Sequence, residues 1–199
     1  AHNTMTAPLT QKQRDDMGVR RGSRPVPLNM LYSIKTDPEN NLDKFKCRLV
    51  LTGSPRFLRK GRDFWATYAA SPSVTTSRIL QFLVVQLGYK VSCSDIKCAF
   101  LEARLKPEEW TVVRMDPEFR QSITNERTGE TEELMPVCTG ALYGHPVSSR
   151  AFSIERTDYI EGPAFNWATR SESWSARRTR YDPCCYVFKH TIYPVKDGP

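Results

Sequence analysis

Two stretches in the first quarter of the chain alternate between apolar and polar positions, as strands with one covered face do. They occupy residues 28–36 and 44–51, and the Asp-Pro-Glu-Asn-Asn segment at 37–41 between them consists of residues that tolerate tight backbone geometry. This pattern predicts an antiparallel hairpin. Because side chains alternate between faces, Lys46 and Arg48 project from the same side of the second strand. The alternation is compatible with a solvated basic face and with a binding surface for an anion.

Apolar side chains next recur at helical spacing, up to Gly88. Thr75, Thr76 and Ser77 offer an N-cap, and a glycine after the run is a common helix end. The apolar positions are Ile79, Leu80, Leu83, Val84 and Leu87. The spacing predicts a helix over 77–87 that packs against a core.

The segment from Lys90 to Leu101 alternates briefly and then becomes apolar after Asp95. It predicts a strand that carries Asp95 at its end, followed at once by the start of a helix. A carboxylate in this place most often caps the helix. It is also a hard oxygen ligand for Mg²⁺, of the kind that phosphoryl transfer uses. Strict alternation puts Asp95 on the side of Val91 and Cys93, so either the strand ends or bulges before Asp95 or that apolar face borders the site.

Four further segments complete the expected fold. The sequence predicts a strand at 110–115, an exposed loop at 121–133, an amphipathic helix at 150–160 and a final strand at 184–188. Strands and helices in this order indicate an α+β fold.

The composition is that of a folded protein with a basic surface. The 199 residues are 39% apolar, with a net charge of +7, which suits a partner that carries phosphates, although charge alone names no partner. Residues 1–27 carry arginines without an apolar period and are expected to form a flexible basic arm. Arginine and aromatic residues interleave at 161–180. That mixture suits nucleic acid, through stacking and phosphate contacts, and suits a protein interface equally.

The six cysteines show no metal-ligand spacing. They predict free thiols in a reducing compartment. No apolar run approaches the ~20 residues of a membrane span, and the first 13 residues lack the features of a signal peptide. We therefore expect an intracellular protein, cytoplasmic or nuclear, without a membrane partner.

The Asp-Ile-Lys-Cys-Ala-Phe-Leu segment at 95–101 resembles the first catalytic motif of reverse transcriptases, most closely Asp-Val-Lys-Thr-Ala-Phe-Leu of the copia-type retrotransposon enzymes. Further blocks resemble the same family in the same order, over roughly residues 28–188. These blocks are Lys46-Cys47-Arg48-Leu49-Val50 with Gly53, Gly61-Arg62-Asp63-Phe64, Thr67-Tyr68-Ala69, Ser77-Arg78, Leu142-Tyr143-Gly144 with Arg150, and Asp182-Pro183-Cys184-Cys185-Tyr186-Val187.

The resemblance implies an RNA-directed DNA polymerase, in which a fingers hairpin precedes an antiparallel palm sheet backed by helices. On this basis the chain divides into the basic arm at 1–27, a fingers-like region at 28–88 with the 77–87 helix, and a partial palm-like region at 89–199 that carries the 161–180 insertion. The implied partners are an RNA template, a DNA primer, and the remainder of the polymerase or another protein subunit.

The resemblance also assigns roles to individual residues. Asp95 would be the catalytic carboxylate, and Mg²⁺ would be held by this side chain and by the backbone carbonyl of Ile96. Lys46 and Arg48 would contact the triphosphate of an incoming nucleotide through charge-assisted hydrogen bonds. Phe100 would lie under the sugar and favour deoxynucleotides, unless it is an ordinary core residue. The implied nucleotide-binding set comprises Lys46, Arg48, Ile96, Phe100 and Arg150.

The sequence departs from the family in its catalytic ligands. The second motif of these enzymes, Tyr-x-Asp-Asp, is absent, and two-metal phosphoryl transfer needs carboxylates on both ions. The late carboxylates are Asp182 and Asp197, and neither sits in a paired motif. Val147 replaces a Gln whose amide would help to seat the template and the nucleotide. The chain is therefore expected to be a piece of a copia-type polymerase, inactive alone; the alternative is a degenerate, non-catalytic descendant that binds RNA or protein.

Overall fold

The computed structural model describes residues 4–20, 24–169 and 171–193, which form two compact units. One unit comprises residues 1–68 and 98–152, and the other comprises 69–97 and 153–199. Each unit joins segments that are distant in sequence, so these boundaries differ from the predicted ones at 27 and 88.

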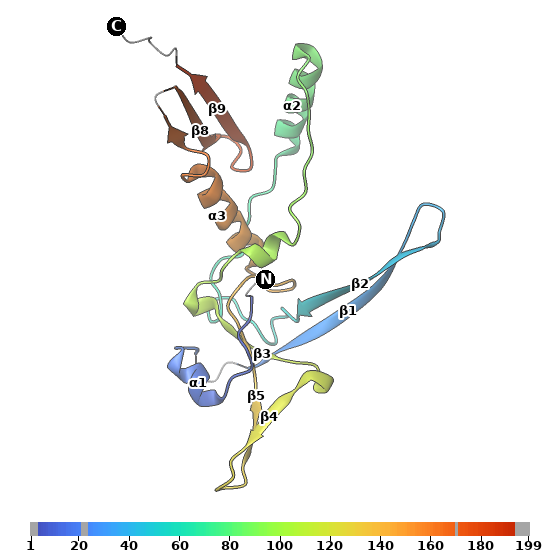
Figure 1. The fold of residues 1–199 in the computed structure, drawn as a ribbon, viewed down its shortest axis with the longest axis vertical. Coiled ribbons are helices and arrows are strands. Elements are labelled where there is room, and N and C mark those ends of the chain that lie inside the picture. Colours follow the sequence, from blue (N-terminus) through green and yellow to red (C-terminus); the bar gives the residue numbers. More distant parts are fainter. Residues whose placement is uncertain (1–3, 21–23, 170, 194–199) are drawn as a thin grey trace. The chain divides into compact units, whose positions relative to one another are not determined.

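The first unit is built on a four-stranded sheet with the order β2-β1-β3-β6, of which Figure 1 labels β1, β2 and β3. β1 (Val26–Thr36) and β2 (Leu42–Leu51) form the predicted antiparallel hairpin, whose turn places Asn40 at a φ of 65°. β3 (Thr111–Arg114) runs parallel to β1 and antiparallel to β6 (Val137–Cys138). The strand predicted at 110–115 is thus confirmed.

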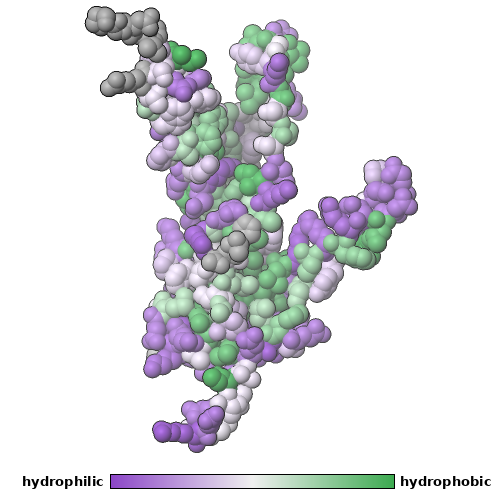
Figure 2. Space-filling view, viewed as in Figure 1, coloured by the Kyte–Doolittle hydropathy of each residue, from purple (hydrophilic) through white to green (hydrophobic). Residues whose placement is uncertain are grey.

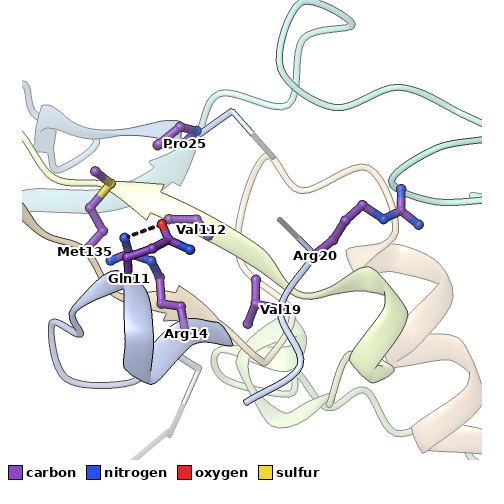
Figure 3. A pocket seen from close by; sticks show the side chains of 7 residues that line it. All are labelled: Gln11, Arg14, Val19, Arg20, Pro25, Val112 and Met135. Atoms are coloured by element: carbon purple, nitrogen blue, oxygen red, sulfur yellow. Dashed lines mark hydrogen bonds between the residues drawn. The ribbon is translucent and has the colours of Figure 1, made fainter. Parts of the chain in front are cut away.

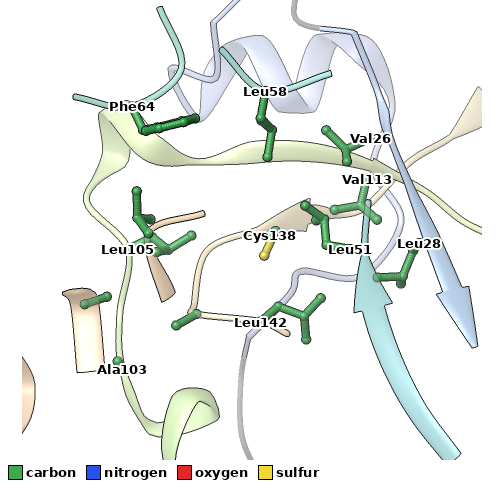
Figure 4. Close-up of a cluster of buried hydrophobic side chains, with 13 residues drawn as sticks. Val26, Leu28, Leu51, Leu58, Phe64, Ala103, Leu105, Val113, Cys138 and Leu142 are labelled. Atoms are coloured by element: carbon green, nitrogen blue, oxygen red, sulfur yellow. The ribbon is translucent and has the colours of Figure 1, made fainter. Parts of the chain in front are cut away.

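The core of this unit lies where the base of the hairpin meets β3 and β6. Leu28 and Leu51 face each other across the hairpin, and both are buried together with Val113 of β3 and Cys138 of β6 (Figure 4). Burial raises the pKa of the Cys138 thiol to about 12. This cysteine therefore behaves as a small hydrophobic side chain.

The prediction of a flexible arm is wrong for residues 4–20, which pack on the first unit. α1 (Gln11–Asp16) begins with a capping box between Thr10 and Gln13. The backbone of Leu9 exchanges hydrogen bonds of 3.1 and 3.0 Å with Met135, and Val19 is buried in a small apolar cluster. Isolated apolar residues produce no periodic pattern in the sequence, but each of these residues packs in the tertiary structure.

A cavity of about 190 Å³ lies between this arm and β3 (Figure 3). Val19 and Val112 line it together with the buried side chain of Arg14. Arg14 Nη1 donates to the Leu9 carbonyl at 2.5 Å, and Nη2 donates to Gln11 Oε1 at 2.9 Å. The guanidinium therefore fixes the turns of the arm around it.

Residues 121–133 are also more ordered than predicted. β4 (Gln121–Thr124) and β5 (Thr131–Leu134) pair as an exposed antiparallel hairpin around the turn-like segment at 125–129. The sequence of these strands does not alternate between apolar and polar residues, because neither face of this hairpin is buried. Short 3₁₀ turns at Ala99–Glu102, Pro107–Glu109 and Pro117–Phe119 complete the unit.

The second unit contains α2, most of α3 and a three-stranded antiparallel sheet. α2 (Val74–Leu87) begins at the cap Ser73 and ends at Gly88, which has a φ of 67°. α3 (Ser148–Glu161) includes the predicted 150–160 helix. The sheet has the order β7-β8-β9, from β7 (Trp167–Ala168), β8 (Glu172–Arg178) and β9 (Tyr186–Ile192). The segment at 161–180, which showed no period, thus contributes two strands, and the strand predicted at 184–188 begins at 186 and extends to 192.

The structure corrects two expectations, one for the residues around Asp95 and one for α2. Residues 89–96 are irregular and exposed instead of forming a strand, since no described segment pairs with them, and the expected helix start is the 3₁₀ turn at Ala99–Glu102. α2 forms as a helix but contains no buried residue, so it is not a packed core helix. Apolar side chains such as Phe82 and Val85 lie on its surface, as Figure 2 shows for this helix.

All six cysteines are unpaired thiols. In the described part of the chain, no helix combines the length and apolarity needed to cross a bilayer.

Candidate functional site

One face of the β1–β2 hairpin is strongly cationic. Cross-strand pairs place Lys44 beside Lys35, and they place Lys46 and Arg48 beside the neutral residues Ser33 and Leu31. The positive charge of Arg48, followed by burial and by the other two lysines, lowers the pKa of Lys46. These charges repel one another, and an anionic ligand would relieve the repulsion.

Phe100 belongs to the same unit as this cationic face. Its ring packs edge-on against Tyr143, with centroids 5.7 Å apart and an interplanar angle of 60°, and against Phe152 at 6.1 Å and 71°. Phe100 and Leu49 of β2 both pack against the buried core of this unit. The unit thus brings the turn that carries Phe100 to the hairpin that carries the cations.

Two glycines of the resemblance blocks explain how the Tyr143 segment is held. Leu51 N–H donates to the Tyr143 carbonyl at 2.8 Å. A Cβ atom at Gly53 would lie 2.0 Å from the carbonyl oxygen of Gly144, and a Cβ atom at Gly144 would lie 2.0 Å from that of Leu51. Gly144 also has a φ of 83°, which disfavours other residues. The two backbones therefore cross at a distance that side chains would prevent.

A buried polar cluster follows this crossing. His145 is 4% exposed; its Nδ1 accepts the Val147 N–H at 3.4 Å, and its Nε2 lies 3.4 Å from Thr111 Oγ1. Because Nδ1 accepts an N–H, the ring proton lies on Nε2. Burial lowers the pKa of His145 to about 4, although its hydrogen bond to the Glu109 carbonyl acts in the opposite direction.

Arg150 is engaged inside the same unit. Its guanidinium donates to the Glu109 carboxylate, and the two side chains are 14% and 6% exposed. Arg150 Nε is buried without a hydrogen-bond partner. The structure thus places this residue in a buried ion pair, whereas Lys46 and Arg48 lie on the surface of the hairpin.

Asp95 and Ile96 belong to the second unit. Both lie in the irregular 89–96 segment and are exposed. Among the residues that the structure describes, no group of three or more His, Cys, Asp or Glu side chains could hold a metal ion. One carboxylate with one carbonyl does not fit the ligand set of a two-metal centre. Asp197 lies outside the described residues.

The other late carboxylate, Asp182, is occupied by hydrogen bonds. It is 3% exposed and accepts the backbone N–H groups of Ser73 and Cys184, both at 2.9 Å. These bonds, and one from the Thr76 hydroxyl, lower the pKa of Asp182. The carboxylate therefore joins the start of α2 to the turn before β9, and this role accounts for Asp in the Asp-Pro-Cys block.

Asp63, in another resemblance block, is similarly structural. Burial alone would raise the pKa of Asp63, but hydrogen bonds from the Arg62 guanidinium and the Arg59 N–H lower it. The Arg62 Nη2 to Asp63 Oδ2 distance is 2.7 Å. This block therefore shapes a turn of the first unit that also buries Phe64.

The structure thus groups Lys46, Arg48, Phe100 and Arg150 in one unit and places Asp95 and Ile96 in the other. Sequence reasoning gave no role to Tyr143, Glu109 or His145. Tyr143 belongs to a recognisable block and is the one that a motif signal could have identified. Glu109 and His145 carry no pattern, because they meet only in the tertiary structure.

Comparison with known proteins indicates a retrotransposon origin. The chain is similar to part of a retrovirus-related Pol polyprotein. That relative is the Pol polyprotein from transposon TNT 1-94 of Nicotiana tabacum, which is 31% identical over 88 residues. The match covers 44% of this chain and 6% of the relative, which is therefore a much longer protein. No family model matches the chain, and no solved structure matches it.

Proposed function

We propose that the chain is a piece of a copia-type RNA-directed DNA polymerase, with a fingers-like hairpin and part of a palm. The observation that carries this proposal is the similarity to a transposon Pol polyprotein over 88 residues. The motif blocks at 46–50, 95–101 and 142–144 resemble the polymerase region of such a polyprotein and support this part of the proposal.

The geometry of the first unit supports a nucleotide-binding role. Lys46 and Arg48 offer two cations on one face to a triphosphate. Phe100 is held by two rings, so its position is fixed, as a residue that selects against a ribose 2′-hydroxyl requires. In this proposal, Tyr143 supports Phe100 from the backbone crossing at Gly144.

The proposed polymerase is inactive as this chain alone. Mg²⁺ would supply charge neutralisation at the transferred phosphate, and Asp95 with the Ile96 carbonyl would provide its ligands in this chain. These ligands do not complete the set, so further carboxylates would come from another part of the polyprotein. The partners in this proposal are an RNA template and a DNA primer.

A primer-extension assay with Mg²⁺ or Mn²⁺ tests the catalytic part. We expect no extension by this chain, with Asp95→Ala as the control. Extension that Asp95→Ala abolishes would refute the inactive state and show that other groups complete the site.

A binding assay tests the hairpin. Affinity for a labelled RNA–DNA hybrid should fall linearly as salt rises on a log–log plot, because cations release counterions from phosphates. The double variant Lys46→Gln/Arg48→Gln should reduce the slope by about 2. Lys12→Gln/Arg127→Gln, which removes two exposed cations elsewhere in the unit, is the matched control. Equal slopes for the two double variants would contradict the assigned role.

Two observations favour the alternative of a degenerate, non-catalytic subunit that binds RNA or protein. Val147, in the place of the family's Gln, is fully buried, and Arg150 is held by Glu109. Neither side chain is presented to a nucleotide. Mapping of the native transcript separates the two functions: continuation into Tyr-x-Asp-Asp supports the polymerase, and a stop codon after Pro199 supports the subunit.

A further inference from the structure

The 161–180 insertion builds a row of aromatic rings on the sheet of the second unit. Trp167 of β7 lies opposite Trp174 of β8, and Trp174 lies opposite His190 of β9. Side chains of directly paired residues share a face of the sheet. The three rings therefore form one row across three strands.

The row is held in a defined geometry. The rings of Trp174 and His190 are nearly parallel, with centroids 4.4 Å apart and an interplanar angle of 13°. His190 Nε2 lies 2.8 Å from Glu172 Oε2, which fixes the imidazole from the side. Trp167 is 39% exposed. The row is thus ordered and reaches solvent at Trp167.

Part of this sheet face is covered by α3 and by Phe165. Ala176 is buried, and Phe188 packs edge-on against Phe165, which packs in turn against Tyr159 of α3. Tyr186 hydroxyl and Thr157 hydroxyl lie 2.8 Å apart, again between the sheet and α3. The aromatic row is therefore the end of the face that α3 does not cover.

The charges around the row favour a polyanion. The described acids of residues 161–193 are all engaged: Glu161 pairs with Arg178, Glu172 with His190, and Asp182 accepts backbone N–H groups. By contrast, the structure pairs no described acid with the exposed cations Arg177, Arg180 and Lys189. Lys189 lies on the edge strand β9, and because side chains alternate along a strand it projects from the face opposite His190. A phosphate chain that crosses this edge would meet the lysine.

We propose that Trp167, Trp174 and His190 form a stacking platform for unpaired bases of single-stranded nucleic acid. A base stacked on Trp167 extends the row, and Lys189 on the edge strand β9 contacts the phosphates of a strand that crosses this edge. Aromatic stacking accepts any base, so the platform has little sequence preference. This inference rests on the nucleic-acid partner of the proposed function and places a second contact outside the hairpin.

Fluorescence anisotropy with a labelled 12-nucleotide single strand and with the matching duplex tests the platform on the full chain. Trp167→Ala should weaken single-strand binding about tenfold, and Trp167→Phe, which keeps a ring, should retain most of it. Lys189→Gln should weaken both ligands and reduce the salt slope. Trp65→Ala, which removes an exposed tryptophan of the other unit, is the control and should bind as the unmodified chain does.

The outcomes separate the platform from the proposed function. If the chain binds oligonucleotide but Trp167→Ala and Trp65→Ala behave alike, the platform is wrong while the proposed function stands. Binding of neither ligand at low salt would contradict both. If sedimentation shows that the chain self-associates through Trp167, with oligonucleotide affinity unchanged in Trp167→Ala, the row is a protein interface and the platform is refuted. Thermal unfolding of each variant confirms that the fold is retained.

Discussion

Protonation of His145 is expected to destabilise the first unit at mildly acidic pH. The imidazole accepts the Val147 N–H at Nδ1, so a proton on that atom would face another donor. Among the described residues, the Glu109 carbonyl and the Thr111 hydroxyl are the polar groups at the ring that could stabilise a cation, and the Glu109 carboxylate already binds Arg150. Acid should therefore open the segment that follows the Gly144 crossing.

The magnitude follows from the pKa. Folding lowers the pKa of His145 from 6.5 to about 4, so the unfolded chain takes up the proton first. The stabilising contribution is complete above pH 6.5 and is lost as the pH falls through the folded pKa. The full difference is about 3 kcal/mol at ~1.4 kcal/mol per pKa unit, of which about 2 kcal/mol is lost by pH 5.

Urea unfolding at pH 7.5 and at pH 5.0, followed by tryptophan fluorescence, measures this difference. His145→Leu replaces the titrating imidazole by an apolar side chain, and it should remove most of the pH dependence. His190→Gln, at an exposed histidine of the other unit, is the matched control and should leave it unchanged. An NMR titration of His145 near 6.5, or an equal pH dependence in His145→Leu, would refute the reasoning.

Three further predictions concern the packing of the chain. Gly144→Ala should destabilise the first unit by about 3 kcal/mol more than Gly18→Ala in thermal unfolding. Both glycines have positive φ, but a Cβ at Gly18 meets no atom within 4 Å. Equal losses of stability would show that the backbone crossing shifts to accommodate the Cβ. Asp182→Asn should speed amide hydrogen exchange in the first turn of α2. Because hydrogen bonds lower the pKa of Asp182, the unmodified chain should lose the same protection as the pH falls below about 4. Unchanged exchange would contradict the role of Asp182 in holding the start of α2. Glu109→Gln should cost about 3 kcal/mol in urea unfolding by leaving Arg150 buried without its counter-charge, and Glu109→Leu combined with Arg150→Met should cost less; additive losses would contradict this.

The sequence predicted the elements that show an apolar period or a helix cap. The β1–β2 hairpin, α2, β3 and α3 all have such signals, and all four formed. Residues 4–20 and the β4–β5 hairpin lack them, because scattered apolar anchors and two-sided polar strands have no period. The 89–96 segment is the reverse case: its alternation was present, but a strand also needs a neighbour with which to pair.

For the candidate site, the sequence alone determined which chemical groups the chain offers for binding or catalysis. It identified the cations Lys46 and Arg48, the ring of Phe100 and the single carboxylate of Asp95, because these belong to contiguous motifs. Only the tertiary structure decided their surroundings. It placed Tyr143 against Phe100, closed Arg150 into an ion pair and saturated Asp182 with donors, since such contacts join segments whose separation along the chain leaves no local pattern.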